Sequence, residues 1–249
     1  MTSFFRPAWL STLGLSLCLS THAATIFKAN NANNLNLASS WSNSVAPGAS
    51  DVATWNHLVV INTNSALGAN LSWSGIKILD PAGPITFAAG YTLTNGASGI
   101  DLSLAANSLT LSNNVVLNAN QTWNVTNGQT LTVAGVVSGA RVLTITNSGT
   151  VILGAANTYS AGTAISNGIV QPNTVSSFGP GTVTNSGGTL RLSGFPAAGI
   201  MTNAFFVTGT SMIDMAGGTV AYNLNGAWSG NGTILVTNDT GSGSTLTFG

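Results

Sequence analysis

The chain has 249 residues, of which only 4% are charged, and its five basic and five acidic residues balance to a formal net charge of zero. This balance excludes an electrostatic basis for binding nucleic acid or anionic lipid, because both require clustered Lys and Arg. All acidic residues are Asp, and the helix-favouring residues Glu, Lys, Arg and Gln are absent or scarce, whereas Gly, Thr, Asn and Val are frequent. The composition therefore favours short strands joined by turns over helices.

Residues 1–24 have the features of a secretory signal peptide. Arg6 lies in a short head, an apolar stretch covers 8–19, and small residues follow at an expected cleavage point. The only cysteine, Cys18, lies in this segment and lacks the small preceding residue that a lipoprotein site needs. We therefore expect an exported chain without disulfides or a reactive thiol.

A short alternation of an apolar residue, a threonine and another apolar residue recurs along the chain. It places the two apolar side chains on one face of a strand and the threonine on the other, so each copy predicts a short, half-buried strand. The copies are at 85–87, 91–93, 109–111, 131–133, 143–145 and 246–248. Apolar residues otherwise come in twos and threes, so we expect no membrane-spanning segment after the leader.

Turn residues separate the expected strands. Five Asn-Gly pairs, which tolerate positive φ, predict turns, and five glycines placed directly before a Thr and an apolar residue predict corners. The pairs are at 95–96, 127–128, 167–168, 225–226 and 231–232, and the corner glycines are at 149, 181, 188, 218 and 232. Asn-Gly also suits hairpins, so an antiparallel sandwich stays an alternative, but many near-identical short strands favour a solenoid.

The predicted fold class is all-β, a right-handed single-stranded parallel β-helix with roughly two dozen residues per coil. We expect an amino-terminal cap and the first rungs over 25–66, and β-helix repeats over 67–249. The last alternation falls in the middle of a rung and carries neither charge nor proline to protect its edge. The sequence therefore predicts that the repeat continues beyond Gly249 and that this end self-associates.

One segment resembles a known family. Residues 149–163 read G-T-V-I-L-G-A-A-N-T-Y-S-A-G-T, which is similar to the autotransporter-associated β-strand repeat, G-T-L-x-L-x-G-x-N-T-Y-x-G-G-T, with Ala155 and Ala161 near expected glycines. Residues 99–139 resemble the rungs that precede this repeat in large bacterial surface proteins, and 41–55 resemble their amino-terminal opening. The resemblance implies a pectin-lyase-like β-helix in an exported passenger or surface protein. It transfers no catalytic residues.

Two aspartates form the best candidate for a catalytic pair. Asp80 and Asp101 are separated by about one coil, and glycoside hydrolysis generally needs two carboxyl groups facing one bond. However, Asp80 precedes a Pro-Gly turn and Asp101 alternates with apolar neighbours, so we expect both side chains to be solvated and not catalytic. His57, the only histidine after the leader, is expected to be a structural residue near the cap. We predict no catalytic, metal or cofactor site.

Aromatic residues are the remaining ligand candidates. Trp73 and Trp123 alternate with apolar residues and are expected to point into the core. Tyr159, Tyr222 and Trp228 lie beside Gly, Ser and Asn in expected corners, where an exposed ring could stack on a sugar. A glycan-binding module is therefore one alternative.

The function expected from these features is that of a secreted bacterial surface protein, a non-catalytic β-helical stalk or adhesin-like element. The alternatives are a carbohydrate-active β-helix enzyme, either a polysaccharide lyase or a hydrolase, and a glycan-binding module. The expected location is extracellular or at the outer-membrane surface. The expected partners are surface glycans or other cells, with no cofactor and no nucleic acid, and anchoring or export is assigned to a region beyond Gly249.

Overall fold

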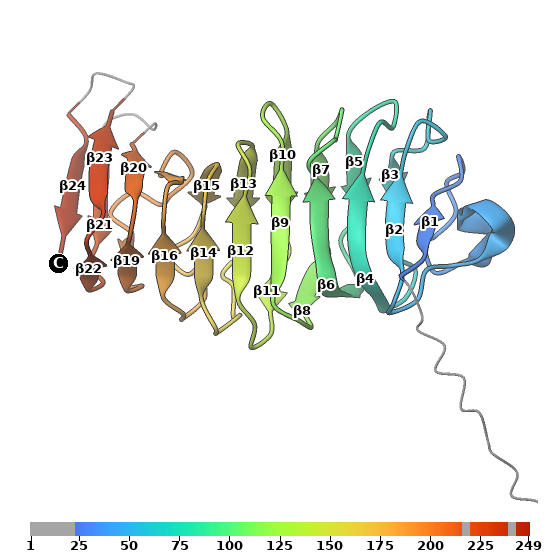
Figure 1. Cartoon of the computed structure of the whole chain (residues 1–249), viewed down its shortest axis with the longest axis horizontal. Helices are drawn as coiled ribbons and strands as arrows, with labels where there is room; N and C mark the ends of the chain where they lie inside the picture. The colour runs from blue at the N-terminus through green and yellow to red at the C-terminus, as the bar shows by residue number, and fades with distance from the viewer. Residues whose placement is uncertain (1–22, 216–219, 239–242) are drawn as a thin grey trace, which may run out of the picture.

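The computed structural model describes residues 23–215, 220–238 and 243–249, and the predicted signal peptide lies almost entirely outside this range. The described residues form 24 strands and two short 3-10 helices, which wind into an elongated parallel β-solenoid of about nine turns (Figure 1). Every pairing between these strands is parallel, from β1 with β2 to β21 with β24. The predicted all-β parallel β-helix is confirmed, and the antiparallel sandwich is wrong.

Two sheets run along most of the solenoid. The twelve-stranded sheet contains β1 (Thr25–Phe27), β2 (Val52–Trp55), β4 (Leu71–Ile78), β6 (Thr92–Leu102), β8 (Asn114–Leu117), β9 (Gln121–Val125), β11 (Val137–Ser138), β12 (Leu143–Thr146), β14 (Thr163–Ile165), β16 (Val183–Asn185), β19 (Phe205–Val207) and β22 (Trp228–Gly230). The nine-stranded sheet contributes one strand per turn: β3 (Asn64–Ser65), β5 (Ile85–Phe87), β7 (Leu109–Leu111), β10 (Thr130–Val133), β13 (Thr150–Leu153), β15 (Ile169–Pro172), β17 (Thr189–Arg191), β20 (Thr210–Asp214) and β23 (Thr233–Thr237). A three-stranded sheet of β18 (Ile200–Met201), β21 (Ala221–Leu224) and β24 (Thr245–Phe248) lies near the carboxyl-terminal end.

Successive turns have similar lengths, which matches the predicted coil of roughly two dozen residues. The longest sequence separation between register partners in successive turns is that from Thr25 of β1 to Val52 of β2. The shortest is that from Thr150 of β13 to Ile169 of β15. Most other steps span 20 to 24 residues, as in the pairing of Leu131 with Leu109. The register is therefore regular enough to place inward side chains above one another.

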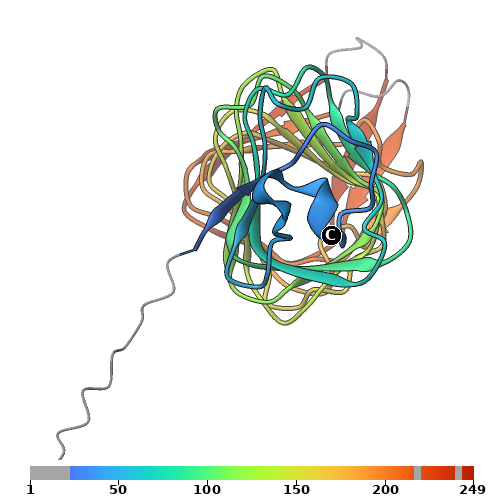
Figure 2. The same ribbon diagram turned by 90° about the vertical axis from the view of Figure 1, so that its right-hand side faces the viewer.

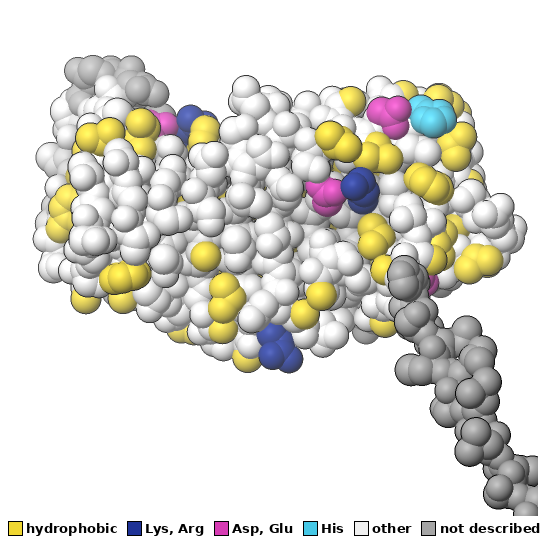
Figure 3. Space-filling view, viewed as in Figure 1, with side chains coloured by type: hydrophobic (Ala, Val, Ile, Leu, Met, Phe, Trp, Pro, Cys, Tyr) yellow, Lys and Arg dark blue, Asp and Glu magenta, His cyan; other side chains and the backbone are white. Residues whose placement is uncertain are grey.

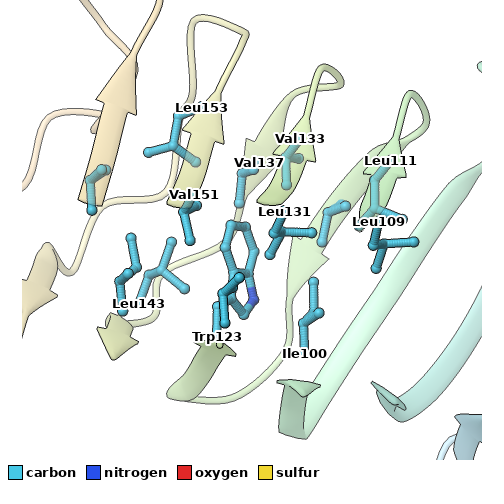
Figure 4. Packing of buried hydrophobic residues seen from close by; sticks show 14 of the residues in the cluster. Ile100, Leu109, Leu111, Trp123, Leu131, Val133, Val137, Leu143, Val151 and Leu153 are labelled. Carbon is cyan, nitrogen blue, oxygen red and sulfur yellow. The ribbon is translucent and has the colours of Figure 1, made fainter. Parts of the chain in front are cut away.

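The interior is a continuous apolar ladder. In the strands predicted at 85–87, 109–111 and 131–133, the apolar residues are buried and the central threonine is half-buried. Trp73 and Trp123 are 1% and 0% exposed, which confirms that both point inward. Figure 4 shows that the inward side chains of β7, β10 and β13 fill the space beside those of the twelve-stranded sheet: Leu109, Leu131 and Val151 with Ile100, Trp123 and Leu143.

Three details of the strand predictions need correction. Tyr91 is 54% exposed and precedes β6, and Phe248 is 45% exposed at the end of β24. The pair at 95–96 is not a turn, because it lies inside β6 and the Asn95 side chain is fully buried. Its Nδ2 donates to Gln121 Oε1 at 2.6 Å in the next turn, so burial with a hydrogen-bond partner overrides the local turn preference. The other four Asn-Gly pairs lie between strands.

The amino-terminal end of the core is closed by two helical turns, η1 (Ala38–Ser40) and η2 (Ser42–Ser44), which lie across the opening of the solenoid (Figure 2). Trp41, between them, is 2% exposed and packs edge-to-face on Trp55 and Trp73, with ring centroids 5.5 and 5.7 Å apart. Its Nε1 donates to the Leu35 carbonyl at 2.8 Å, so the buried ring leaves no unpaired donor.

Corner glycines are required where one turn approaches the next. Four of the five predicted glycines precede strands β13, β16, β17 and β23, and the fifth, at 218, lies outside the described residues. A Cβ at Gly149 would collide with the Thr126 carbonyl oxygen and would lie 2.6 Å from Val125 Cγ1. The spacing between turns therefore excludes a side chain at this corner.

We expect Gly149→Ala to lower the free energy of unfolding by about 1–3 kcal/mol, because the added methyl forces two turns apart. The matched control is Gly83→Ala, where the nearest atom to the new methyl is Thr63 Cγ2 at 3.6 Å. This control should change stability by less than about 0.5 kcal/mol. Chemical denaturation measures both values, and equal stabilities of the two variants would contradict the argument.

Candidate functional site

Ionisable side chains are few and lie apart on a largely neutral surface (Figure 3). Among the described residues, the ion pairs each join two neighbouring turns. They are His57 with Asp80 at 3.5 Å, Lys77 with Asp101 at 2.9 Å, and Arg191 with Asp214 at 2.8 Å. The two candidate catalytic carboxylates therefore have different partners, His57 for Asp80 and Lys77 for Asp101.

Asp101 lies in β6 directly beside Lys77 of β4, which confirms its outward strand position. Its side chain is only 28% exposed, so the expectation of a solvated carboxylate needs correction. Burial opposes ionisation of this carboxyl, but hydrogen bonds from Lys77 and Ser103 outweigh burial and hold its pKa below the usual range. Asp101 is therefore ionised at neutral pH and poorly suited to act as a general acid.

Asp80 follows β4, and its side chain is 57% exposed, as predicted for a turn. It accepts a hydrogen bond from the His57 backbone amide at 2.9 Å and contacts the imidazole of the same residue. The His57 side chain is 71% exposed, so its contact with Asp80 holds a loop at the surface and does not form an enclosed pocket. No three His, Cys, Asp or Glu residues in the described part of the chain are placed to hold a metal ion.

Two of the three aromatic rings proposed to stack on sugars are buried. Tyr159 is 0% exposed, and its hydroxyl lies 2.6 Å from Thr163 Oγ1. Burial raises the pKa of Tyr159, and burial together with the Asp214 charge raises that of Tyr222, which is 1% exposed. The predicted exposure of these rings was wrong: Tyr222 occupies an inward position of β21, and the Tyr159 ring, between β13 and β14, is buried against Thr163. Trp228 is half-buried and stacks on Phe205, with ring centroids 4.3 Å apart.

The Arg191–Asp214 pair was missed at the sequence level. Arg191 of β17 and Asp214 of β20 are register partners, and the Asp214 side chain is 5% exposed. The available signal was their separation of one coil length, which places opposite charges next to one another in a solenoid. The pair links two successive turns of the solenoid, those of β17 and β20.

Lys28 is the most unusual ionisable group and was also missed. It is 0% exposed, and its Nζ donates to the carbonyl oxygens of Ala29 and Asn31 at 2.8 Å and to Asn31 Oδ1 at 3.1 Å. Burial lowers its pKa from 10.5 to about 8. Its hydrogen-bond partners are neutral oxygens of the nearby residues Ala29 and Asn31, so Lys28 stabilises the fold of the amino-terminal cap.

An apolar hollow of about 440 Å³ lies at the carboxyl-terminal end of the solenoid. It is lined by Trp228, Ile234, Val236, Phe248 and Gly249, none of which carries a charged side chain. The side chains that line the hollow therefore offer apolar contact. No helix among the described residues has the length and apolar character required to cross a bilayer.

The pKa of Lys28 predicts a specific pH dependence. Between about pH 8 and 10.5 the unfolded chain holds a proton that the folded chain has lost, so raising the pH stabilises the fold. From pH 7.5 to 9.5 we expect the unfolding free energy of the native chain to rise by about 1–2 kcal/mol relative to Lys28→Met. The matched control Lys77→Met retains Lys28 and should keep the rise. Parallel pH profiles for the native chain and Lys28→Met would contradict the assignment.

No protein-family model matches the chain, and comparisons with curated proteins and with solved structures find no match. The parallel β-solenoid therefore rests on the structure itself. The more specific resemblance to autotransporter-associated repeats stays a sequence-based expectation.

Proposed function

We propose that the mature chain is a non-catalytic structural rod, acting as a stalk or adhesin-like element of an exported bacterial surface protein. The observation that carries this proposal is the unbroken parallel ladder from β1 to β22 above one apolar core. In such an array each turn contacts only its neighbours, so length can be added without changing any local structure. A stalk needs this property.

The charges support a role without catalysis. A glycoside hydrolase needs a carboxylic acid whose pKa is raised and a second carboxylate close to it. Here Asp101 has a lowered pKa beside Lys77, and Asp80 is paired with His57. No observation favours the carbohydrate-active enzyme over the rod.

Export is proposed from the sequence. The leader at 1–24, the absence of cysteine after it and the resemblance of 149–163 to repeats of bacterial surface proteins all favour an extracellular location. Glycan recognition by Tyr159 and Tyr222 is not proposed, because both rings are buried. Any adhesive contact is assigned instead to the neutral outer faces of the sheets, whose side chains are largely Thr, Ser and Asn.

A modular rod should tolerate whole added turns. Leu143 is the register partner of Thr163, so residues 143–162 form one complete turn. We expect three extra copies of 143–162, inserted after Gly162, to lengthen the folded rod by about 14 Å, as measured by small-angle X-ray scattering. The matched control inserts the same residues in scrambled order and should disrupt cooperative unfolding. Failure of the repeated insert to fold would contradict the modular rod.

The absence of catalysis is tested directly with the two candidate aspartates. We expect Asp80→Asn combined with Asp101→Asn to leave the β-dominated circular dichroism spectrum unchanged and to lower the unfolding free energy by no more than about 1 kcal/mol, because one exposed and one half-exposed pair are lost. The native chain and the double variant should both leave neutral and acidic polysaccharides intact in a reducing-end assay. Depolymerisation by the native chain but not by the double variant would overturn the proposal in favour of an enzyme.

A further inference from the structure

The five Asn-Gly pairs share one dipeptide sequence but have different surroundings in the fold. In each pair the side-chain amide carbon of Asn lies near the backbone nitrogen of Gly, which has no Cβ to hinder a closer approach. One pair, 95–96, lies inside β6, and the pairs at 127–128, 167–168, 225–226 and 231–232 lie between strands. The structure therefore separates positions that the sequence alone makes equivalent.

The pair at 127–128 is the most open of the five. Asn127 and Gly128 are the exposed central residues of a β-turn, which the Gln129 amide closes by donating to the Thr126 carbonyl at 3.1 Å. Gly128 has a φ of +80°, and a Cβ built on it would meet nothing within 4 Å. Neither the Asn127 side chain nor the Gly128 amide has a hydrogen-bond partner among the described residues.

The end of this turn is anchored, whereas its two central residues are not. The Gln129 Nε2 donates to the Ala106 carbonyl at 3.1 Å, and its Oε1 accepts from the Ser108 hydroxyl at 3.0 Å, both in the preceding turn of the solenoid. Residues 127–128 are held only through the backbone. Their conformation can therefore change without opening the core.

At two other pairs the glycine amide is already engaged. The Gly168 amide donates to Asn167 Oδ1 at 2.8 Å, and the Gly232 amide donates to the Val207 carbonyl at 3.0 Å. Each hydrogen bond holds the proton that must leave before the nitrogen can act as a nucleophile. These bonds must break before either pair reacts.

The remaining two pairs are enclosed by the core or by a neighbouring turn. Asn95 is 0% exposed, and its Nδ2 donates to Gln121 Oε1 at 2.6 Å. Gly226 is buried, and a Cβ built on it would collide with the Asn203 carbonyl oxygen. Movement of the backbone at either pair requires separation of two turns.

We propose that Asn127 is a site of spontaneous deamidation in the folded chain, with the Gly128 amide nitrogen as the nucleophile. This nitrogen loses its proton to solvent and forms a bond to Asn127 Cγ. The bond from Cγ to Nδ2 then breaks, and Nδ2 leaves as ammonia after gaining a proton. Water adds to either carbonyl of the resulting succinimide ring and opens it, which yields aspartate or isoaspartate at position 127.

The modification changes charge at one exposed corner of a neutral surface. It replaces an amide with a carboxylate in a chain that has five acidic residues, and the isoaspartate product also adds one methylene to the backbone. The open space around Gly128 accommodates that extra group. The proposal is independent of the stalk function, because the reaction uses only two adjacent residues and water.

The experiment incubates the folded exported chain at mildly alkaline pH and follows each Asn-Gly pair by digestion and mass spectrometry. We expect Asn127 to react at least about tenfold faster than Asn95 or Asn167, which corresponds to a barrier difference of about 1.4 kcal/mol. The matched control is the same chain unfolded in urea, where the pairs should react at similar rates because their surroundings are lost. Equal rates in the folded chain, or the same preference for Asn127 in urea, would overturn the proposal.

Two variants identify the product independently of digestion. Anion exchange of the incubated native chain should show a more acidic species that elutes with Asn127→Asp and keeps the native circular dichroism spectrum. This species should be absent from Asn127→Gln, because the longer side chain closes a larger ring more slowly, and it should persist in the control Asn167→Gln. Persistence of the species in Asn127→Gln, or its loss in Asn167→Gln, would contradict the assignment to Asn127.

Discussion

The structure depends on one constraint, the stacking of each inward side chain on its equivalent one turn away. One such column runs through Ile100, Trp123, Ile145 and Ile165 and continues to Asn185. A polar residue is tolerated in the column because Asn185 exchanges hydrogen bonds with the Gly188 backbone, which satisfies its amide within the same turn. The parallel hydrogen bonds fix the spacing, and burial of the column supplies the driving force.

The same constraint determines where charges can be placed. In the described part of the chain, the charge pairs join residues 23 or 24 positions apart, which is one turn: His57 with Asp80, Lys77 with Asp101, and Arg191 with Asp214. Each pair therefore reinforces the contact between two stacked turns.

The sequence predicts the repeated strands of the fold, but it does not predict residues whose position depends on contacts made at one site only. Alternation at 109–111 and 131–133 specifies which side chains are inside, because strand periodicity is a local property. Tyr159 was misplaced because flanking Gly and Ser mark a bend without showing on which side of it the ring lies. Asn95 was assigned to a turn because its partner, Gln121, is distant in sequence. Lys28 was missed because nothing local indicates a buried ammonium surrounded by carbonyl oxygens.

The amino-terminal end of the solenoid shows how a repetitive fold meets a boundary. Each internal turn is covered on both sides by a similar turn, so its inward positions are mostly apolar. A boundary lacks one of these copies, and the fold must supply other groups for the exposed core and the unpaired backbone. At the amino-terminal end these are Trp41, Lys28 and a loop that bonds to the ladder. The amino-terminal turn therefore differs from the internal turns in the side chains that cover it, since the strands themselves pair in the same parallel way.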